Sequence, residues 1–185
     1  EGKPDAAIYH PTNNTWTNLP DMNAGRWYPT TTILGNGDVL VVSGDIFPDT
    51  VNQLPQVWDT RHNAWRNLTD AQFPWALYPF LFLAPDGRVF NAGPSQDTQF
   101  IDTSGTGSLT EGPRSSYGRF DGSAVMYDEG KILVVGGSLG EDPPIALAEK
   151  IDLNNLEDDW TPAGSMAFAR KYHNATLLPD GTVLV

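Results

Sequence analysis

The chain repeats one pattern of apolar and polar residues four times. In each copy an apolar segment runs into a short turn that contains a glycine, and a second apolar segment follows. The clearest copy is 30–44, and the others are 80–93, 124–137 and 175–185. The turn glycines are Gly37, Gly87, Gly130 and Gly181, which lie 50, 43 and 51 residues apart. Each copy therefore predicts two β-strands joined by a tight turn whose glycine has a positive φ angle.

A second marker alternates with the first. Further hairpins are predicted to begin around residues 9, 58, 101 and 151, at intervals of 49, 43 and 50 residues. Trp16 and Trp65 follow the first two of these positions by seven residues, and Trp160 follows the last through a longer turn. The two markers together predict four strands per repeat, with these tryptophans packed between neighbouring sheets.

The spacing of the repeats indicates the architecture. A period near 50 residues is typical of kelch repeats, whereas WD repeats span about 40–45. A single four-stranded sheet cannot bury both of its faces, so successive sheets stack around an axis. The predicted fold is therefore all-β, a kelch-type β-propeller. We expect residues 1–185 to form one partial propeller domain with three full blades and two half blades.

The half blades allow two interpretations. Either the chain is a fragment of a larger propeller, or its two half blades pair to close a four-bladed ring. The last strand, 182–185, stops before the glycine that ends the equivalent strand at Gly44, Gly93 and Gly136. We therefore favour the fragment, which would expose apolar blade faces and associate with the missing propeller remainder or with itself.

Composition excludes several classes of partner. The formal net charge is −12 and the basic residues are scattered, so no nucleic-acid surface is predicted. No apolar run reaches the roughly 18 residues that cross a bilayer, so we expect no membrane partner. The segment 1–5 lacks the apolar core of a signal peptide. With no cysteine, the chain has neither a disulfide framework nor a zinc-thiolate site.

The candidate site lies where the inner strands begin. Equivalent residues of successive blades converge on a propeller axis and surround a shallow pocket. Counted in steps of one repeat, these positions are predicted at Tyr28, Tyr78, Phe120 and Tyr172, with His173 beside the last. We expect the three tyrosines and the histidine to point toward a common centre. The alternative is that Tyr28 and Tyr78 are ordinary packed residues of the inner strands.

Several segments resemble one known family. The segment Met22-Asn23-Ala24-Gly25-Arg26-Trp27-Tyr28-Pro29, with the hairpin that follows it, resembles the part of glyoxal oxidases and galactose oxidases that carries their redox-active tyrosine. Segments 77–95, 124–128 and 170–181 are similar to the same family, so the resemblance covers essentially the whole chain. It implies a seven-bladed propeller, and copper in the intact parent family. Family members oxidise alcohols or aldehydes and reduce O₂ to hydrogen peroxide.

The resemblance also implies roles for individual residues. Family members hold copper with two histidines, an axial tyrosine and an equatorial tyrosine linked to a cysteine by a thioether. Tyr28 matches the linked tyrosine, which makes it the expected catalytic residue and metal ligand, although this chain has no cysteine to bond it. The pair Tyr172-His173 comes three repeats after Tyr28, whereas the family's copper-binding pair comes four repeats after. Tyr172, His173 and Tyr78 are therefore expected in the pocket without binding copper.

The predicted function is a fragment of a copper radical oxidase that acts on a small aldehyde, alcohol or carbohydrate. We expect the isolated chain to bind no copper and to be inactive. By resemblance, the protein is extracellular or at the cell surface. The alternative is a non-catalytic kelch propeller that binds a glycan or a protein through its aromatic axial face.

Three minor features of the sequence remain. His10 and His62 are predicted in turns, without a metal. The run Glu157-Asp158-Asp159 is predicted to be a solvated turn. Sequons for N-glycosylation begin at Asn13, Asn67 and Asn174, of which Asn174 lies in a predicted inner strand and is not expected to be modified.

Overall fold

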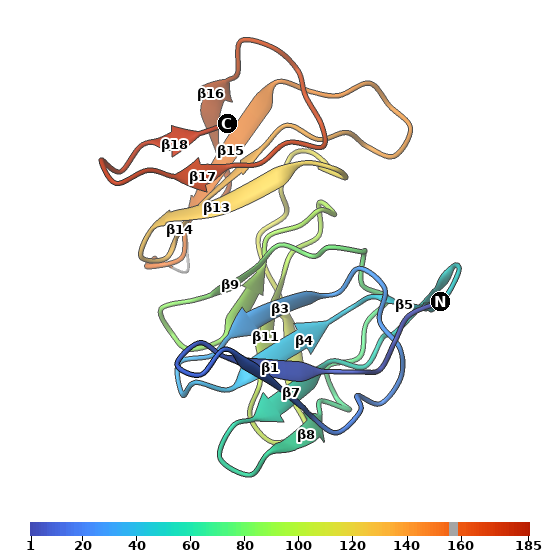
Figure 1. The fold of residues 1–185 in the computed structure, drawn as a ribbon. Coiled ribbons are helices and arrows are strands. Elements are labelled where there is room, and N and C mark those ends of the chain that lie inside the picture. Colours follow the sequence, from blue (N-terminus) through green and yellow to red (C-terminus); the bar gives the residue numbers. More distant parts are fainter. Residues whose placement is uncertain (156–158) are drawn as a thin grey trace. The chain divides into compact units, whose positions relative to one another are not determined.

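The structure is a computed structural model that describes residues 1–155 and 159–185. Within these ranges it contains eighteen β-strands and no helix, which confirms the all-β prediction (Figure 1). Accordingly, no helix of the described residues could span a membrane. Of the predicted acidic turn, Glu157 and Asp158 lie outside the described residues. The chain divides into two compact units, one formed by 1–79 with 103–108 and the other by 80–102 with 109–185.

Three four-stranded antiparallel sheets follow one another along the chain. The first contains β3 (Thr30–Ile33), β4 (Val39–Val42), β7 (Gln56–Asp59) and β8 (Ala64–Asn67). The second contains β9 (Leu81–Leu83), β10 (Val89–Asn91), β11 (Gln99–Asp102) and β12 (Ser108–Glu111). The third contains β13 (Ser123–Asp128), β14 (Lys131–Val135), β15 (Leu147–Asp152) and β16 (Thr161–Ser165). Within each sheet the strands are hydrogen-bonded in chain order, which is the order of a propeller blade.

Two hairpins form separate two-stranded sheets near the ends of the chain. The hairpin of β1 (Ala7–His10) and β2 (Thr15–Asn18) belongs to the first unit, and that of β17 (Thr176–Leu177) and β18 (Val183–Leu184) belongs to the second. The strand content therefore confirms the prediction of three full blades and two half blades.

The inner hairpins are built as the turn residues predict. In the first blade Thr30 pairs with Val42 and Ile33 pairs with Val39, so the turn between the strands is short. The four predicted turn glycines, Gly37, Gly87, Gly130 and Gly181, have φ angles of 87°, 88°, 69° and 83°. Residues with a Cβ rarely adopt this backbone conformation, which explains the recurrence of glycine at these turns.

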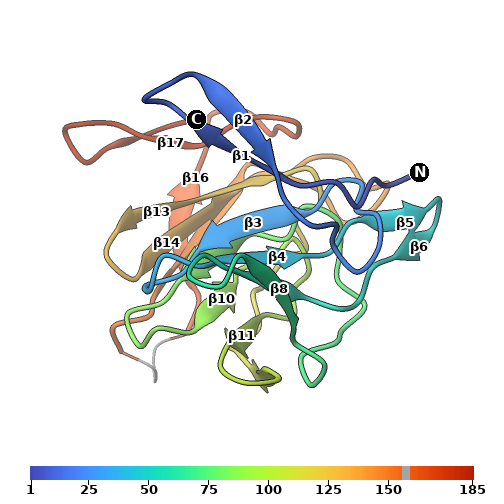
Figure 2. The ribbon, with the colours of Figure 1, turned by 60° about the horizontal axis from the view of Figure 1, so that its bottom comes forward.

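A short additional hairpin interrupts the first blade between β4 and β7. It consists of β5 (Asp45–Phe47) and β6 (Thr50–Val51). The amino-terminal segment lies beside it, where the Gly2 N–H donates to the Ile46 carbonyl over 3.0 Å (Figures 1 and 2). The backbone of Trp27 also pairs with Asp45, so this hairpin borders the start of the inner strand that carries Tyr28.

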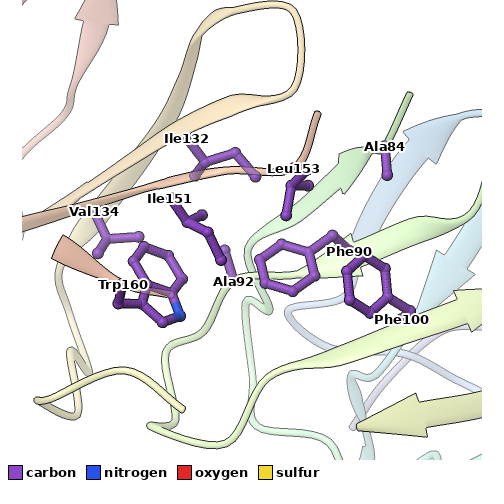
Figure 3. Packing of buried hydrophobic residues seen from close by; sticks show 9 residues of the cluster. All are labelled: Ala84, Phe90, Ala92, Phe100, Ile132, Val134, Ile151, Leu153 and Trp160. Atoms are coloured by element: carbon purple, nitrogen blue, oxygen red, sulfur yellow. The ribbon is translucent and has the colours of Figure 1, made fainter. Parts of the chain in front are cut away.

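Two neighbouring sheets of the second unit share an apolar core (Figure 3). Phe90, on β10, packs between Phe100 and Trp160, with ring centroids 4.8 and 6.3 Å away. Ile132 and Val134, on β14, are fully buried in the same cluster. Face-to-face burial of this kind is how successive blades of a propeller stabilise one another.

Two of the predicted packing tryptophans also make equivalent hydrogen bonds. The indole N–H of Trp65 donates to the Pro20 carbonyl over 2.8 Å, and that of Trp160 donates to the Pro113 carbonyl over 3.0 Å. In each case the proline follows the last strand of the preceding hairpin: Pro20 follows β2, and Pro113 follows β12. Trp16 contacts Tyr9, with the ring planes tilted by 45°, but it is 68% exposed, so its predicted burial between sheets is not present in this structure.

Buried arginines hold the ends of the inner strands together in two blades. The Arg26 guanidinium donates to the Ser43 and Leu54 carbonyls over 2.8 and 2.6 Å. The Arg119 guanidinium donates to the Gly136 and Leu147 carbonyls over 3.1 and 2.8 Å. In each blade one carbonyl directly follows the second strand and the other lies near the start of the third. We call this arrangement the arginine clamp.

The two clamps differ in the residue that faces the guanidinium. Arg119 donates to the Glu149 carboxylate over 2.8 Å, and both side chains are only 2–3% exposed. At the same register position in the first blade, Arg26 meets the neutral amide of Gln56 at 3.4 Å. Burial lowers the pKa of Arg26 to about 10. The second unit thus contains a buried ion pair where the first has a buried cation with polar partners.

Removal of the Glu149 charge is expected to destabilise the chain strongly. In Glu149→Gln the buried Arg119 loses its counter-ion, and the free energy of unfolding should fall by about 3 kcal/mol. The matched control is Asp97→Asn, which breaks the ion pair between Asp97 and Arg114, whose side chains are both 61% exposed. The control should cost less than about 1 kcal/mol. Urea unfolding measures both values, and equal losses in the two variants would contradict this account of the clamp.

Candidate functional site

One residue with left-handed backbone precedes the inner strand in every repeat. Tyr28, Tyr78, Asp121 and Tyr172 have φ angles of 64°, 52°, 59° and 57°. A residue with a bulky side chain seldom adopts this conformation, which stores about 1–3 kcal/mol of strain. Since the left-handed conformation recurs before the inner strand in four repeats, it is a regular feature of this fold.

This backbone pattern corrects the predicted position in the third repeat. Trp27 forms a β-bridge with Asp45, and Phe120 forms the same bridge with Ser138. Phe120 therefore corresponds to Trp27, and the residue that corresponds to Tyr28 is Asp121. The prediction of Phe120 as the third position of the aromatic series is wrong by one residue.

The sequence contains a signal for the correct alignment. An arginine lies two residues before Tyr28, Asp121 and Tyr172, at Arg26, Arg119 and Arg170. The first two arginines form the clamps, so the left-handed residue comes directly after a pair of anchored positions. An alignment on the arginines, rather than on the aromatic side chains, would have identified Asp121.

Hydrogen bonds join consecutive left-handed residues inside each unit. In the first unit the Tyr78 N–H donates to the Tyr28 carbonyl over 3.2 Å. In the second unit the Tyr172 N–H donates to the Asp121 carbonyl over 2.7 Å. The residue before one inner strand is thus hydrogen-bonded to the residue before the next inner strand.

Three aromatic rings of the first unit form a continuous stack. The Trp27 and Tyr28 ring centroids are 3.6 Å apart with an interplanar angle of 25°, and the Tyr28 and Tyr78 centroids are 4.5 Å apart with an angle of 27°. Tyr28 is 39% exposed and Tyr78 is 52% exposed. We call these three residues the aromatic stack. The structure thus brings together two of the predicted site residues, Tyr28 and Tyr78.

The two phenols of the stack interact electrostatically. The pKa of Tyr78 is raised above its usual value, first because partial burial disfavours the phenolate and then because Tyr78 hydrogen-bonds with Tyr28. A raised pKa means that the Tyr78 phenol keeps its proton to a higher pH than a free phenol does.

The other two predicted site residues lie in the second unit. Tyr172 is 76% exposed, and the Lys171 ammonium is 5.2 Å from the centre of its ring. His173 is half-buried, and burial, followed by the positive charge of Arg170, lowers its pKa. The imidazole approaches the chain at Gly136, where a Cβ would lie 2.6 Å from His173 Cε1.

The remaining histidines take part in local contacts. His10, the last residue of β1, hydrogen-bonds with the Thr17 hydroxyl over 3.1 Å, and His62 hydrogen-bonds with Asp59 over 2.8 Å. No group of three histidine, cysteine, aspartate or glutamate side chains that could hold a metal occurs in 1–155 or 159–185. The roles assigned to Tyr28, Tyr78, Tyr172 and His173 by resemblance stay predictions.

Comparison with known proteins gives matches over nearly the whole chain. A galactose oxidase of Gibberella zeae is 26% identical over 97% of this chain, which spans 30% of that protein. An aldehyde oxidase GLOX of Vitis pseudoreticulata is 26% identical over 92% of the chain, which spans 36% of it. No protein-family model matches. The chain therefore spans about a third of the length of these curated relatives.

Solved structures with the same fold agree with this result. A fungal alcohol oxidase of the AA5 family, solved in complex with copper, superposes with a TM-score of 0.87 at 23% identity over 98% of this chain and 42% of its own. The structure of YjhT matches with a TM-score of 0.70 at 12% identity, over 92% of this chain and 67% of its own. Such similarities show the fold, which is a β-propeller.

Two independent lines of evidence thus agree. The relatives matched by sequence are a galactose oxidase and an aldehyde oxidase, and the matched fold is that of a copper-bound alcohol oxidase. The strand order and the recurring inner hairpins are those expected of a β-propeller. The chain is similar in sequence to a galactose oxidase and an aldehyde oxidase, and it shares the β-propeller fold of a copper-bound alcohol oxidase.

Proposed function

We propose that this chain forms part of the catalytic propeller of a copper radical oxidase. The parent protein would oxidise a small alcohol or aldehyde by two electrons and pass these electrons to O₂, which yields hydrogen peroxide. The observation that carries the proposal is the aromatic stack, which holds Tyr28 against two other rings at the position where the family resemblance assigns a redox-active tyrosine.

Electron counting explains why such an enzyme needs a tyrosine. Oxidation of an alcohol to an aldehyde removes two electrons, whereas one copper ion stores only one. A phenol that loses one electron and its proton supplies the second store. Stacking against Trp27 and Tyr78 supports this role, because the neighbouring π-systems interact favourably with an electron-poor ring.

Tyr78 supports the same role through its proton. Because its pKa is raised, the Tyr78 phenol stays neutral beside the Tyr28 ring, 4.5 Å away between ring centroids, and it holds that ring in the stack. Arg26 contributes indirectly. It directly precedes Trp27, and its hydrogen bonds to the Ser43 and Leu54 carbonyls hold the backbone of the stack in place. We therefore assign Tyr28 as the catalytic residue and Tyr78 as a positioning residue.

The donors of this chain fit only part of a copper site. A phenolate oxygen is a suitable ligand for Cu(II), and bound copper would supply the one-electron acceptor. The chain contains no cysteine, and the described residues offer no cluster of metal-binding side chains around Tyr28. We therefore propose that the isolated chain is inactive, and that further ligands come from other parts of the parent protein. Tyr172 and His173 are assigned to the wall of the pocket.

The substrate and the location follow from the same proposal. The oxidase relatives indicate a small alcohol or aldehyde as the substrate, and a carbohydrate is the narrower proposal. The parent protein would act outside the cell or at its surface. The missing propeller remainder would be the natural partner of this chain, and self-association would replace it in isolation.

A second function is favoured by one observation. Trp27, Tyr28 and Tyr78 are 47%, 39% and 52% exposed, so the stack also offers an aromatic surface of the kind that recognises glycans or proteins. If the parent protein is a non-catalytic kelch propeller, substitution of Tyr28 should change binding and no oxidation should be detected.

The oxidase proposal is tested on the longest reading frame that includes this chain. The copper-loaded protein should release hydrogen peroxide from at least one of galactose, glyoxal and methylglyoxal in air. Tyr28→Phe should reduce kcat/KM by about 1,000-fold, equivalent to about 4 kcal/mol of barrier, because the second electron store is lost. Tyr9→Phe, which removes a phenol outside the stack, should retain activity. Unchanged turnover in Tyr28→Phe, or peroxide from the 185-residue chain alone, would contradict the proposal.

Alkaline titration tests the assignment of Tyr78. Absorbance near 295 nm follows the ionisation of the six tyrosines, and one of them should ionise later than a free phenol because the pKa of Tyr78 is raised. This late step should disappear in Tyr78→Phe and persist in Tyr9→Phe. The unfolded chain loses the Tyr78 proton at a lower pH than the folded chain does. The free energy of unfolding should therefore decline above about pH 10, and this decline should be less steep in Tyr78→Phe. Identical titrations of the three proteins would refute the hydrogen-bonded pair.

A further inference from the structure

The three N-glycosylation sequons of the chain have different surroundings. Asn13, Asn67 and Asn174 each precede a threonine by two residues, and all three are exposed. Exposure alone therefore does not distinguish them. The difference lies in what the asparagine amide and the threonine hydroxyl contact, and in what the adjacent backbone does.

Asn13 is located in the exposed turn between β1 and β2. All five residues from 11 to 15 are exposed. The Thr15 hydroxyl donates to the Asn13 amide oxygen over 2.8 Å, so the two side chains of the sequon are already paired. The amide nitrogen of Asn13 makes no hydrogen bond to another described residue, which leaves it available for a covalent bond.

The rest of the turn fixes this arrangement. The Tyr9 hydroxyl donates to the Asn14 amide oxygen over 2.8 Å, and Asn14 has a left-handed φ of 55°. The middle residue of the sequon is thus held by β1 while Asn13 and Thr15 face each other. A glycan on Asn13 would extend into solvent from the turn at the end of the hairpin, so its attachment would not require any strand pairing to break.

Asn67 is tied into its blade. Its amide oxygen accepts a hydrogen bond from the amide of Gln56 over 2.8 Å, and Gln56 is buried against the Arg26 clamp. The next residue, Leu68, is fully buried, and the Thr69 hydroxyl is directed to Asp70 at 3.5 Å rather than to Asn67.

Asn174 lies between two residues whose backbone N–H groups are hydrogen-bonded to the preceding repeat. The Tyr172 N–H donates to Asp121, and the Ala175 N–H donates to the Ser123 hydroxyl over 2.9 Å. Asn174 also directly follows His173, which is assigned to the wall of the pocket. A branched sugar at this position would crowd the candidate site.

We propose that Asn13 is an N-glycosylation acceptor, and that it is occupied in preference to Asn67 and Asn174. The proposal rests on the extracellular location given under the proposed function. In the transfer, Asn13 Nδ2 loses one proton and bonds to the anomeric carbon of an oligosaccharide carried on a polyprenyl diphosphate. The carbon–oxygen bond to the diphosphate breaks, and the diphosphate leaves with the electron pair. The bulky glycan would shield the exposed rings of Tyr9 and Trp16 on the same hairpin.

The test is expression behind a secretion leader in yeast. The chain is recovered from medium and cell membranes together, so that retained protein is also counted. Peptide-N-glycosidase in ¹⁸O water then marks each occupied asparagine, and mass spectrometry reads the three sites. Most molecules should carry the mark at Asn13, and at least several-fold fewer should carry it at Asn67 or Asn174. Asn13→Gln and Thr15→Ala should each abolish the main glycoform.

Asn14→Gln is the matched control. It changes the same turn but keeps an Asn-Gln-Thr sequon, so occupancy at Asn13 should persist. An unmodified Asn13, or occupancy at Asn67 or Asn174 equal to that at Asn13, would overturn the proposal. The readout requires neither copper nor substrate, so this result is independent of whether the parent protein is an oxidase.

Discussion

The arginine clamp is the interaction on which the candidate site depends. A guanidinium buried at the start of an inner strand donates to backbone carbonyls where the second strand ends and the third begins, and so ties these segments together. The clamp at Arg26 anchors the chain two residues before Tyr28. The backbone can then sustain the left-handed conformation at Tyr28, because the strain is opposed by fixed contacts on both sides.

Much of the fold could be predicted from the sequence because it depends on local and periodic features. Turn glycines such as Gly37 and Gly181 identify hairpins, and their spacing identifies the repeat. Strand order within a blade then follows chain order, since consecutive antiparallel strands need only short connections. The hairpin β5–β6 was not predicted, because it lies inside one blade and does not recur in the others.

Less of the site could be predicted. The sequence predicts Tyr28 and Tyr78 at equivalent positions, but it does not show that their rings stack or that their phenols interact, since both depend on side-chain rotamers. Phe120 was misplaced because aromatic character guided the alignment, whereas the backbone conformation is shared by tyrosine and aspartate. The contrast between Gln56 and Glu149 opposite the two clamps likewise depends on which side chains meet across a sheet.

The central claim is that Tyr28 is the residue that this fold prepares for one-electron oxidation. The most direct measurement is electron paramagnetic resonance of the copper-free protein that contains this chain, after treatment with a one-electron oxidant. The account predicts a phenoxyl radical signal in the native protein and in Tyr78→Phe, and its loss in Tyr28→Phe. An undiminished radical in Tyr28→Phe would show that the oxidisable residue lies elsewhere and would contradict the account.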